Sequence, residues 1–385
     1  MRILMPVLAR LPSSRAPALQ TANMAQAFVE LGHDVTVSSP APALTTELPE
    51  GWVPGDPVAD LLGYAPGFTL VHGATRVRRG QSVTQSLRVA RLAQRIEPDL
   101  IVSRNLRGVL LPAARGVPTV VEFHTMSTVH SGVDRGALAQ LRQSRGYRGV
   151  VAISQPLADD LVASGAVTED EVLVAPDAVR VTGPAPDAPL RSAAGGGWHV
   201  GYTGALYAGK GAEVVVALAV RHPDITFHVA GGPADRAMEL RERAARGLPN
   251  LVVHGLLSQP ATQALQRSCD VLVAPFAATV LSDSGVDIAR WTSPLKVFEY
   301  LASGRPSIVG DLPGLRGVLE DGHDALVVPA GDVDAFSAAL VRLTSDPALA
   351  ERIGRAGRES AVTRWSWTAR AQRILDRFAP DHSAR

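Results

Sequence analysis

The chain has 385 residues, of which 46% are hydrophobic and 19% charged, and its formal net charge at pH 7 is +1. This length allows two domains with large cores, and the small net charge argues against a nucleic-acid binder that works by bulk charge. The single cysteine, Cys269, excludes an internal disulfide framework and fits a reducing cytosol, so we expect it to be a small buried apolar residue.

The sequence carries no apolar run longer than a strand, so we expect no transmembrane segment. The N-terminus is a short apolar segment followed by a polar loop, which lacks the pattern of a signal peptide. Together with the lone cysteine, these features predict a cytoplasmic protein.

The first half alternates strands and helices. Residues 3–8 predict a strand, residues 21–31 an amphipathic helix closed by Gly32, and residues 34–38 a second strand, which is the βαβ unit of a parallel sheet. Further strands are predicted over residues 99–103, 118–123, 149–154 and 172–175. The first turn lacks the glycine-rich dinucleotide fingerprint, which argues against an NAD enzyme.

Two polar side chains directly follow strands of this half. Arg104 follows the strand at 99–103, and His124 follows the strand at 118–123. Ligands of open α/β sheets bind outside the carboxyl ends of the strands. His124 is therefore better placed than any other histidine to touch a substrate, although a purely structural role stays open.

An arginine-rich segment lies between these strands. The helix predicted over residues 81–96 and the loop before it carry Arg76, Arg78, Arg79, Arg88, Arg91 and Arg95. Such a run is either a solvated helix face or a contact with anionic lipid or a phosphorylated acceptor.

The second half restarts the alternation after a linker rich in Pro, Gly and Ala over residues 176–197. A strand at 198–203 leads into a turn from Gly204 to Gly209, and Lys210 opens the next helix. A strand, a glycine-bearing turn and a lysine at a helix start are typical of a phosphate site, although this is not a Walker A loop. Strands at 225–230, 252–255, 270–275 and 325–328 follow, with helices near 315–319, 334–343 and 349–362 and a last helix ending near Phe378.

The stretch from Ser293 to Val309 predicts a helix and then a strand. Ser293 can cap the first turn, Pro294 fits the first helical position, and Gly304 ends the helix. Its N-terminus suits a phosphate or a sugar oxygen, with Lys296 adding charge and Glu299 accepting hydroxyls. An ordinary capped helix with surface charges is the alternative. The whole alternation predicts two facing, Rossmann-like doubly wound α/β domains with a cleft between them.

Several spaced motifs resemble the retaining glycosyltransferases of family 4, which have the GT-B fold. In the second half these are residues 204–211, Gly231-Gly232-Pro233, 270–275, 293–306 and 320–329. In the first half they are residues 31–37 and Glu122-Phe123-His124. The resemblance covers nearly the whole chain and implies an acceptor domain at 1–185, a donor domain at 186–362 and a C-terminal helix at 363–385 that crosses back to the first domain.

The resemblance also implies roles for single residues. Lys210 would pair with the nucleotide diphosphate, Glu299 would bind the ribose hydroxyls, and His124 would contact the donor sugar; these three are the expected catalytic residues. The expected donor-binding residues also include Gly204, Gly231, Gly255, Leu256, Ser293, Pro294, Leu295 and Lys296, and the expected acceptor-binding residues are Ser14, Arg15 and Arg104.

Three positions depart from the family pattern. Trp291 stands where the family often has a first glutamate, Ala205 where it has an arginine, and Pro12 to Ala16 where it has a glycine-rich loop. A subgroup with a Ser-Pro-Leu-Lys helix start shares the first departure. The change at 205 leaves Lys210, with help from Arg290 or Lys296, to neutralise the leaving diphosphate.

The implied activity is transfer of a hexose from a UDP- or GDP-linked sugar to a small or lipid-linked acceptor, with retained anomeric configuration. We expect no metal, no further cofactor and no nucleic-acid partner, with peripheral membrane contact through residues 76–95. Cell-surface glycan or secondary-metabolite synthesis is the expected setting. Two alternatives stay open, namely a catalytically silent nucleotide-sugar-binding subunit and a nucleotide-sugar epimerase.

Overall fold

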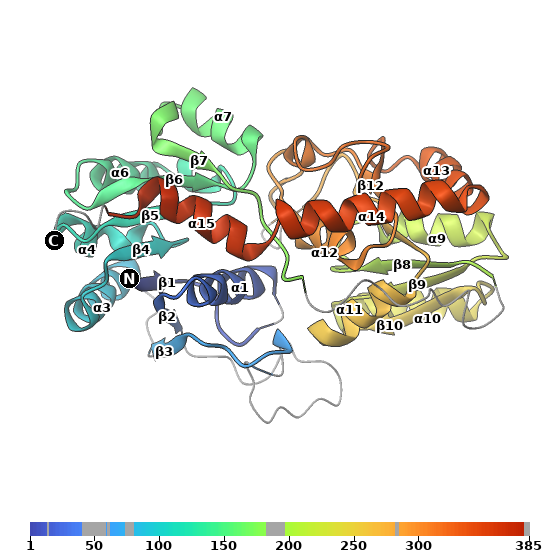
Figure 1. The fold of residues 1–385 in the computed structure, drawn as a ribbon, viewed down its shortest axis with the longest axis horizontal. Helices are drawn as coiled ribbons and strands as arrows, with labels where there is room; N and C mark the ends of the chain where they lie inside the picture. Colours follow the sequence, from blue (N-terminus) through green and yellow to red (C-terminus); the bar gives the residue numbers. More distant parts are fainter. Residues whose placement is uncertain are drawn as a thin grey trace. The chain divides into compact units, whose positions relative to one another are not determined.

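A computed structural model describes residues 1–13, 15–40, 59, 62–73, 81–181, 197–281 and 285–380. The chain divides into two compact units (Figure 1). Unit 1 contains the described residues from Met1 to Asp177 and returns at Trp367, whereas Ala178 to Ser366 form unit 2. The domain boundary expected at 185/186 lies outside the described residues.

Unit 1 is built on a seven-stranded sheet in the order β3-β2-β1-β4-β5-β6-β7, and every neighbouring pair is parallel. Its central strands are buried on both faces, as expected when helices cover a parallel sheet. The strands are β1 (Arg2–Pro6), β2 (Asp34–Pro40), β3 (Thr69–Gly73), β4 (Leu100–Ser103), β5 (Thr119–Phe123), β6 (Tyr147–Ala152) and β7 (Val172–Val174).

The helices of unit 1 connect these strands, and one of them comes from the far end of the chain. That helix is α15 (Trp367–Phe378), which packs against α1 (Ala16–Glu30). Its apolar residues repeat at helical spacing and are buried, including Ala371, Ile374 and Phe378. The remaining helices are α3 (Gln81–Ile96), α4 (Leu110–Ala114), α5 (Ser127–His130), α6 (Gly132–Arg142) and α7 (Gln155–Ala163).

Unit 2 has a six-stranded parallel sheet in the order β10-β9-β8-β11-β12-β13. Its strands are β8 (His199–Thr203), β9 (Thr226–Ala230), β10 (Leu251–Gly255), β11 (Val271–Ala274), β12 (Ser307–Gly310) and β13 (Leu326–Val328). Its helices are α9 (Ala212–Arg221), α10 (Ala234–Ala245), α11 (Gln259–Ser268), α12 (Leu295–Ser303), α13 (Val333–Ser345) and α14 (Pro347–Thr363).

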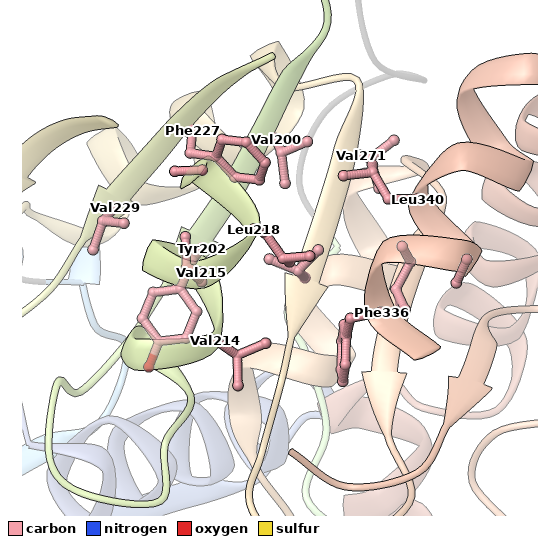
Figure 2. Close-up of a cluster of buried hydrophobic side chains, with 14 of the residues drawn as sticks. Val200, Tyr202, Val214, Val215, Leu218, Phe227, Val229, Val271, Phe336 and Leu340 are labelled. Carbon is pink, nitrogen blue, oxygen red and sulfur yellow. The ribbon is translucent and has the colours of Figure 1, made fainter. Parts of the chain in front are cut away.

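Alternation along the strands divides the core of unit 2 into two layers. Val271 points into a cluster that also holds residues of α9 and α13, such as Leu218 and Phe336 (Figure 2). Val273, two residues further along the strand, belongs to the same cluster. The alternate residues of the same strand, Leu272 and Ala274, point into a second cluster with Val297 of α12. Cys269 and Tyr300 belong to this second cluster too. Both faces of the sheet are therefore covered, which confirms the doubly wound α/β class predicted from the sequence.

Cys269 is fully buried, as expected for a small apolar residue. The prediction of a helix near residues 315–319 is wrong, because the chain makes only a short 3-10 turn at Pro313–Leu315. A Cβ on Gly314 would lie 2.3 Å from the carbonyl oxygen of Thr292, and Gly317 has a φ of +89°. Close packing and a left-handed residue thus stop a helix at this point.

Candidate functional site

Three glycines end three adjacent strands of unit 2. Gly204 follows β8, Gly231 follows β9, and Gly255 is the last residue of β10. A Cβ on Gly231 would lie 1.7 Å from the carbonyl oxygen of Gly204, and the Gly231 amide donates to the carbonyl of Gly255 at 2.8 Å. Leu256, which follows Gly255, lies against Gly232, the residue after Gly231. The sheet therefore brings these expected donor-binding residues together at the carboxyl ends of its strands.

The turn after β8 is fixed by a buried tyrosine. The hydroxyl of Tyr202 donates to the carbonyl oxygen of Ala205 at 2.6 Å and to that of Lys210 at 3.1 Å. Gly211 then takes a φ of +103° at the N-cap of α9. Lys210 thus sits at the end of the turn, one residue before the cap, and the helix that it was predicted to open begins at Ala212.

Lys296 lies beside the same turn. Its Nζ is 4.0 Å from the centre of the Tyr202 ring and 5.0 Å from that of Phe276. A Cβ on Gly204 would lie 2.9 Å from Cε and 3.1 Å from Nζ of Lys296. Burial, and then the charge of Lys210, hold the pKa of Lys296 well below its ordinary value. Lys210 and Lys296 are therefore electrostatic neighbours.

Glu299 lies one turn further along α12 and is held by two amides. Its Oε1 accepts from Nε2 of Gln259 at 2.7 Å, and its Oε2 accepts from Nε2 of Gln266 at 3.1 Å. Gln266 also donates to Oγ1 of Thr203 at the end of β8. Neither glutamine was predicted to be functional. Gln259 directly follows the cap at Ser258, and Gln266 lies two helical turns later on the same face of the helix. This spacing is a signal that could have identified them.

The start of α12 differs slightly from the expectation. The helix begins at Leu295, and Pro294 occupies the N-cap position with an extended backbone (φ −77°, ψ 119°). Ser293, which was expected to be the cap, is buried and lies one residue earlier. Proline has no side-chain acceptor for the first amides of the helix, so none of them is capped by the N-cap residue.

In unit 1, His124 follows β5 and contacts Glu122 of the same strand. Its Nε2 lies 2.5 Å from Oε1 of Glu122. Glu122 also accepts from Nε2 of Gln20 at 2.6 Å and forms an ion pair at 3.1 Å with Arg370 of α15. The side chain of His124 is 17% exposed and that of Glu122 only 2%, so the imidazole is the outward-facing member of the pair.

The charges of this cluster set its protonation. Burial alone would raise the pKa of Glu122, but Arg370, His124 and Arg104 together hold it well below the usual range. Burial lowers the pKa of His124 to about 4, aided by the charge of Arg104. The site therefore holds a carboxylate and a neutral imidazole at pH 7, and a neutral imidazole can accept or donate a hydrogen bond to a sugar.

A second buried carboxyl, Asp177, belongs to the same cluster. Burial raises its pKa to about 7, against the opposing effect of Arg370. Four residues of the His124 cluster were not predicted to be functional, namely Glu122, Asp177, Gln20 and Arg370. The motif Glu122-Phe123-His124 carried a signal for the first, since residues two apart on a strand share a face.

The expected acceptor-binding residues are spread over unit 1. Arg104 follows β4 and donates through Nη1 to Oε1 of Gln20 at 3.2 Å, which attaches it to the His124 cluster. Arg15 is exposed at the N-cap of α1. Ser14 lies outside the described residues.

Carboxylates near these sites have identifiable partners. Asp332 caps α13 by accepting from the amides of Asp334 and Ala335. Asp287 accepts from the amides of Val280 and Ala289, and Asp283 lies outside the described residues. Within the described parts of the chain, only Glu122, His124 and Asp177 bring three potential metal-ligand atoms within 4.8 Å of one another. The guanidinium groups of Arg104 and Arg370 share that cluster and would repel a divalent cation.

Comparison with known families divides the chain as the two sheets do. Residues 18–182 match a family model described as Glycosyltransferase Family 4, and residues 198–346 match one described as Glycosyl transferases group 1. Each half of the chain therefore resembles one domain of these enzymes.

The sequence is similar to curated mannosyltransferases. It is 28% identical over 379 residues to the phosphatidyl-myo-inositol mannosyltransferase of Mycolicibacterium smegmatis, covering 92% of this chain and 87% of that enzyme. A match to the enzyme of the same name from Mycobacterium leprae is 33% identical over 137 residues, but it spans only 33% of that enzyme.

Solved structures share the fold. The Anabaena HepE structure in complex with UDP superimposes with a TM-score of 0.72 at 17% identity, covering 98% of this chain and 99% of that one. Sucrose-phosphate synthase from Thermosynechococcus elongatus gives a TM-score of 0.70, also at 17% identity, with 98% of each chain covered. At such identities the likeness identifies the fold class, which is the GT-B fold with its two parallel-sheet α/β domains.

Proposed function

We propose that this GT-B chain, family 4-like in both of its halves, transfers a hexose from a nucleotide diphosphate sugar to an acceptor hydroxyl with retention of anomeric configuration. The observation that carries the proposal is the cluster at the end of β8, where two lysines, a close-packed glycine turn and Glu299 meet. Cations and backbone amides beside glycines suit a diphosphate, and a nearby carboxylate suits the ribose hydroxyls.

The proposed roles follow from charge and position. Lys210 neutralises the diphosphate, and Glu299, oriented by Gln259 and Gln266, accepts hydrogen bonds from the ribose. The backbone of Gly204, Gly231 and the start of α12 at Ser293 to Lys296 approaches the phosphates and sugar, and Gly255 and Leu256 approach the base. Negative charge develops on the leaving diphosphate during transfer, so these fixed positive groups would stabilise the transition state.

His124 is the proposed sugar-contacting residue of unit 1. Its hydrogen bond to Glu122 orients the imidazole. The side chain of His124 is partly exposed, whereas that of Glu122 is buried. We name no carboxylate nucleophile, and the leaving phosphate is proposed to take the acceptor's proton. Arg15, Ser14 and Arg104 are proposed to bind the acceptor.

The acceptor and the setting are also proposals. The names of the mycobacterial relatives refer to a phosphatidylinositol acceptor, which supports a lipid-linked acceptor and cell-surface glycan synthesis here. No helix within the described residues has the length and apolarity to cross a bilayer. Helix α3 exposes Arg91, Arg95 and 43% of Leu87, a combination suited to peripheral contact with an anionic membrane.

A thermal-shift panel of nucleotides and nucleotide sugars tests the donor site, because a ligand that binds only the folded state raises the unfolding midpoint. We expect UDP or GDP and one of their hexose derivatives to raise it. Turnover with that donor should then persist in saturating EDTA, since Lys210 and Lys296 supply the positive charge. A donor that binds without any turnover would favour a silent binding subunit, as the changes at Trp291 and Ala205 suggest. Rescue of activity by Mg²⁺ or Mn²⁺ after EDTA would refute metal independence.

Two variants separate the proposed roles. Glu299→Ala should weaken binding of both the free nucleotide diphosphate and the sugar nucleotide in calorimetry. His124→Ala should reduce turnover far more than nucleotide affinity, because its proposed contact is with the sugar. Unchanged nucleotide affinity in the first variant, or equal losses of both quantities in the second, would contradict these roles.

A further inference from the structure

Lysine is almost absent from this chain. Of its 38 Lys and Arg residues, only Lys210 and Lys296 are lysines. The two lie close enough for the charge of Lys210 to depress the pKa of Lys296. Everywhere else the chain uses arginine, whose guanidinium stays charged in proteins, whereas a buried lysine amine loses its proton readily. The two lysine amines of the chain are thus concentrated at one site.

The amine of Lys296 is enclosed and lacks an acceptor. Its Nζ has no exposed surface and makes no hydrogen bond to any residue that the structure describes. Below it lie the faces of the Tyr202 and Phe276 rings, which offer a cation only a weak attraction. A buried polar group without a partner is costly, and such a group next to a ligand site calls for an explanation.

The charged and titratable groups that the structure describes around Lys296 leave its amine without a hydrogen-bond acceptor. Lys210, from the turn before α9, repels its positive form, and Glu299, on its own helix, attracts it. Both oxygens of Glu299 are already hydrogen-bonded to glutamine amides. Burial raises the pKa of the neighbouring phenols Tyr202 and Tyr300, so both stay neutral. Without a ligand, the surroundings therefore favour the neutral amine.

The missing acceptor fits the place of the amine in the fold. Cε and Nζ of Lys296 occupy the space beside Gly204 that a side chain would otherwise fill. Lys210 lies at the other end of the same turn. A phosphate group at this turn would give the amine both an acceptor and a counter-charge.

We propose that the amine of Lys296 binds a phosphate group at the turn after β8 and gains a proton when a nucleoside diphosphate binds. The inference rests on the proposed donor site and adds a proton to its binding reaction. The amine takes one proton from the solvent to become an ammonium, which then donates to a phosphate oxygen. Apart from this new N–H bond, no covalent bond of the protein or the nucleotide forms or breaks. Affinity for the nucleotide should therefore fall as the pH rises from neutral.

Because the protein has only two lysines, their protonation can be followed directly. In protein labelled with ¹³C at lysine Cε, NMR should give two resonances, which Lys210→Met and Lys296→Met assign. We expect the Lys296 resonance to titrate well below the ordinary lysine value of about 10.4. Saturating UDP or GDP should move its midpoint upward by more than 1 unit. An ordinary midpoint in the free protein would overturn the inference.

Calorimetry with UDP and GDP in buffers of different ionisation enthalpy measures the proton directly. At pH 8 we expect uptake of 0.5–1 proton per bound nucleotide by the wild-type protein. Lys296→Met should bind at least 10-fold more weakly without uptake. Lys296→Arg, which keeps the charge but cannot be neutral, should bind without uptake and serves as the matched control. Nucleotide binding with no uptake by the wild type would overturn this inference alone, whereas no binding of any nucleotide would overturn the donor site itself.

Discussion

At the scale of single residues, the buried charges of unit 1 depend on one another. Arg370 is fully buried, and Glu122 is the carboxylate with which it forms an ion pair. Glu122→Gln would leave two buried guanidinium groups without that counter-charge, so we expect it to lower the free energy of unfolding by about 3–5 kcal/mol. Urea denaturation measures this.

The matched control for that variant is an exposed ion pair. Glu242 and Arg246 are one turn apart on the surface of unit 2. Glu242→Gln should change the free energy of unfolding by no more than about 0.5 kcal/mol. Equal effects of the two glutamine substitutions would show that the Glu122 cluster contributes no special stability.

Asp177 should give the protein a distinct pH dependence. Burial raises its pKa to about 7, so between pH 4 and 7 the folded protein holds a proton that the unfolded chain has lost. Its contribution to stability is therefore complete at low pH and is lost as the pH rises towards 7. His124 has the opposite trend, because its pKa is lowered to about 4, but this trend is common to the wild type and any Asp177 variant.

The Asp177→Asn variant isolates this effect. Because asparagine carries no charge, the variant should gain stability relative to the wild type as the pH rises from 4 to 8, by up to about 4 kcal/mol. Urea unfolding at several pH values gives the difference. Parallel curves for the two proteins would mean that Asp177 is ionised in the fold at all these pH values.

At the scale of secondary-structure elements, the glycine after β9 allows the ends of neighbouring strands to pack closely. A Cβ on Gly231 would lie 1.7 Å from the carbonyl oxygen of Gly204, and its φ is +157°. Neither backbone can yield without displacing a strand, so Gly231→Ala should destabilise unit 2 on the order of 3 kcal/mol or more.

At another glycine, we expect substitution by alanine to change the stability in the opposite direction. Gly136 lies within α6, and a Cβ there would have no atom within 4 Å. Gly136→Ala should therefore stabilise unit 1 by about 0.5–1 kcal/mol through helix propensity. Thermal unfolding of the two alanine variants tests both signs, and a destabilising Gly136→Ala would mean that the helix is strained at this point.

At the scale of the whole molecule, the C-terminal helix completes unit 1. Arg370 of α15 donates to the carbonyl oxygens of Ala175 and Pro176, just after β7, and contacts Sδ of Met24 in α1. Arg370→Met removes these bonds while keeping most of the apolar stem. Amide exchange should then become faster in the strands of unit 1, with β8 to β13 unchanged. Equal acceleration in both units would show that they unfold as one cooperative body.

The sequence by itself determined the class of fold and indicated the residues that are proposed for the donor site. Strands and helices of regular length alternate, and glycines follow the strands, so both the parallel sheets and the phosphate-type turn at Gly204 could be predicted locally. The helix carrying Lys296 and Glu299 was also predictable, because its C-cap glycine and its apolar spacing are properties of consecutive residues.

Only the tertiary structure decided how the charges are paired. Glu122 meets Arg370 because α15 returns to the first sheet, and Glu299 meets Gln266 because α11 and α12 pack together. No local pattern encodes such contacts between distant segments. The burial that leaves the Lys296 amine without an acceptor likewise depends on Tyr202 of β8 and on Phe276, which lies just after β11. Protonation follows from desolvation and neighbouring charge, and both are properties of the packed fold.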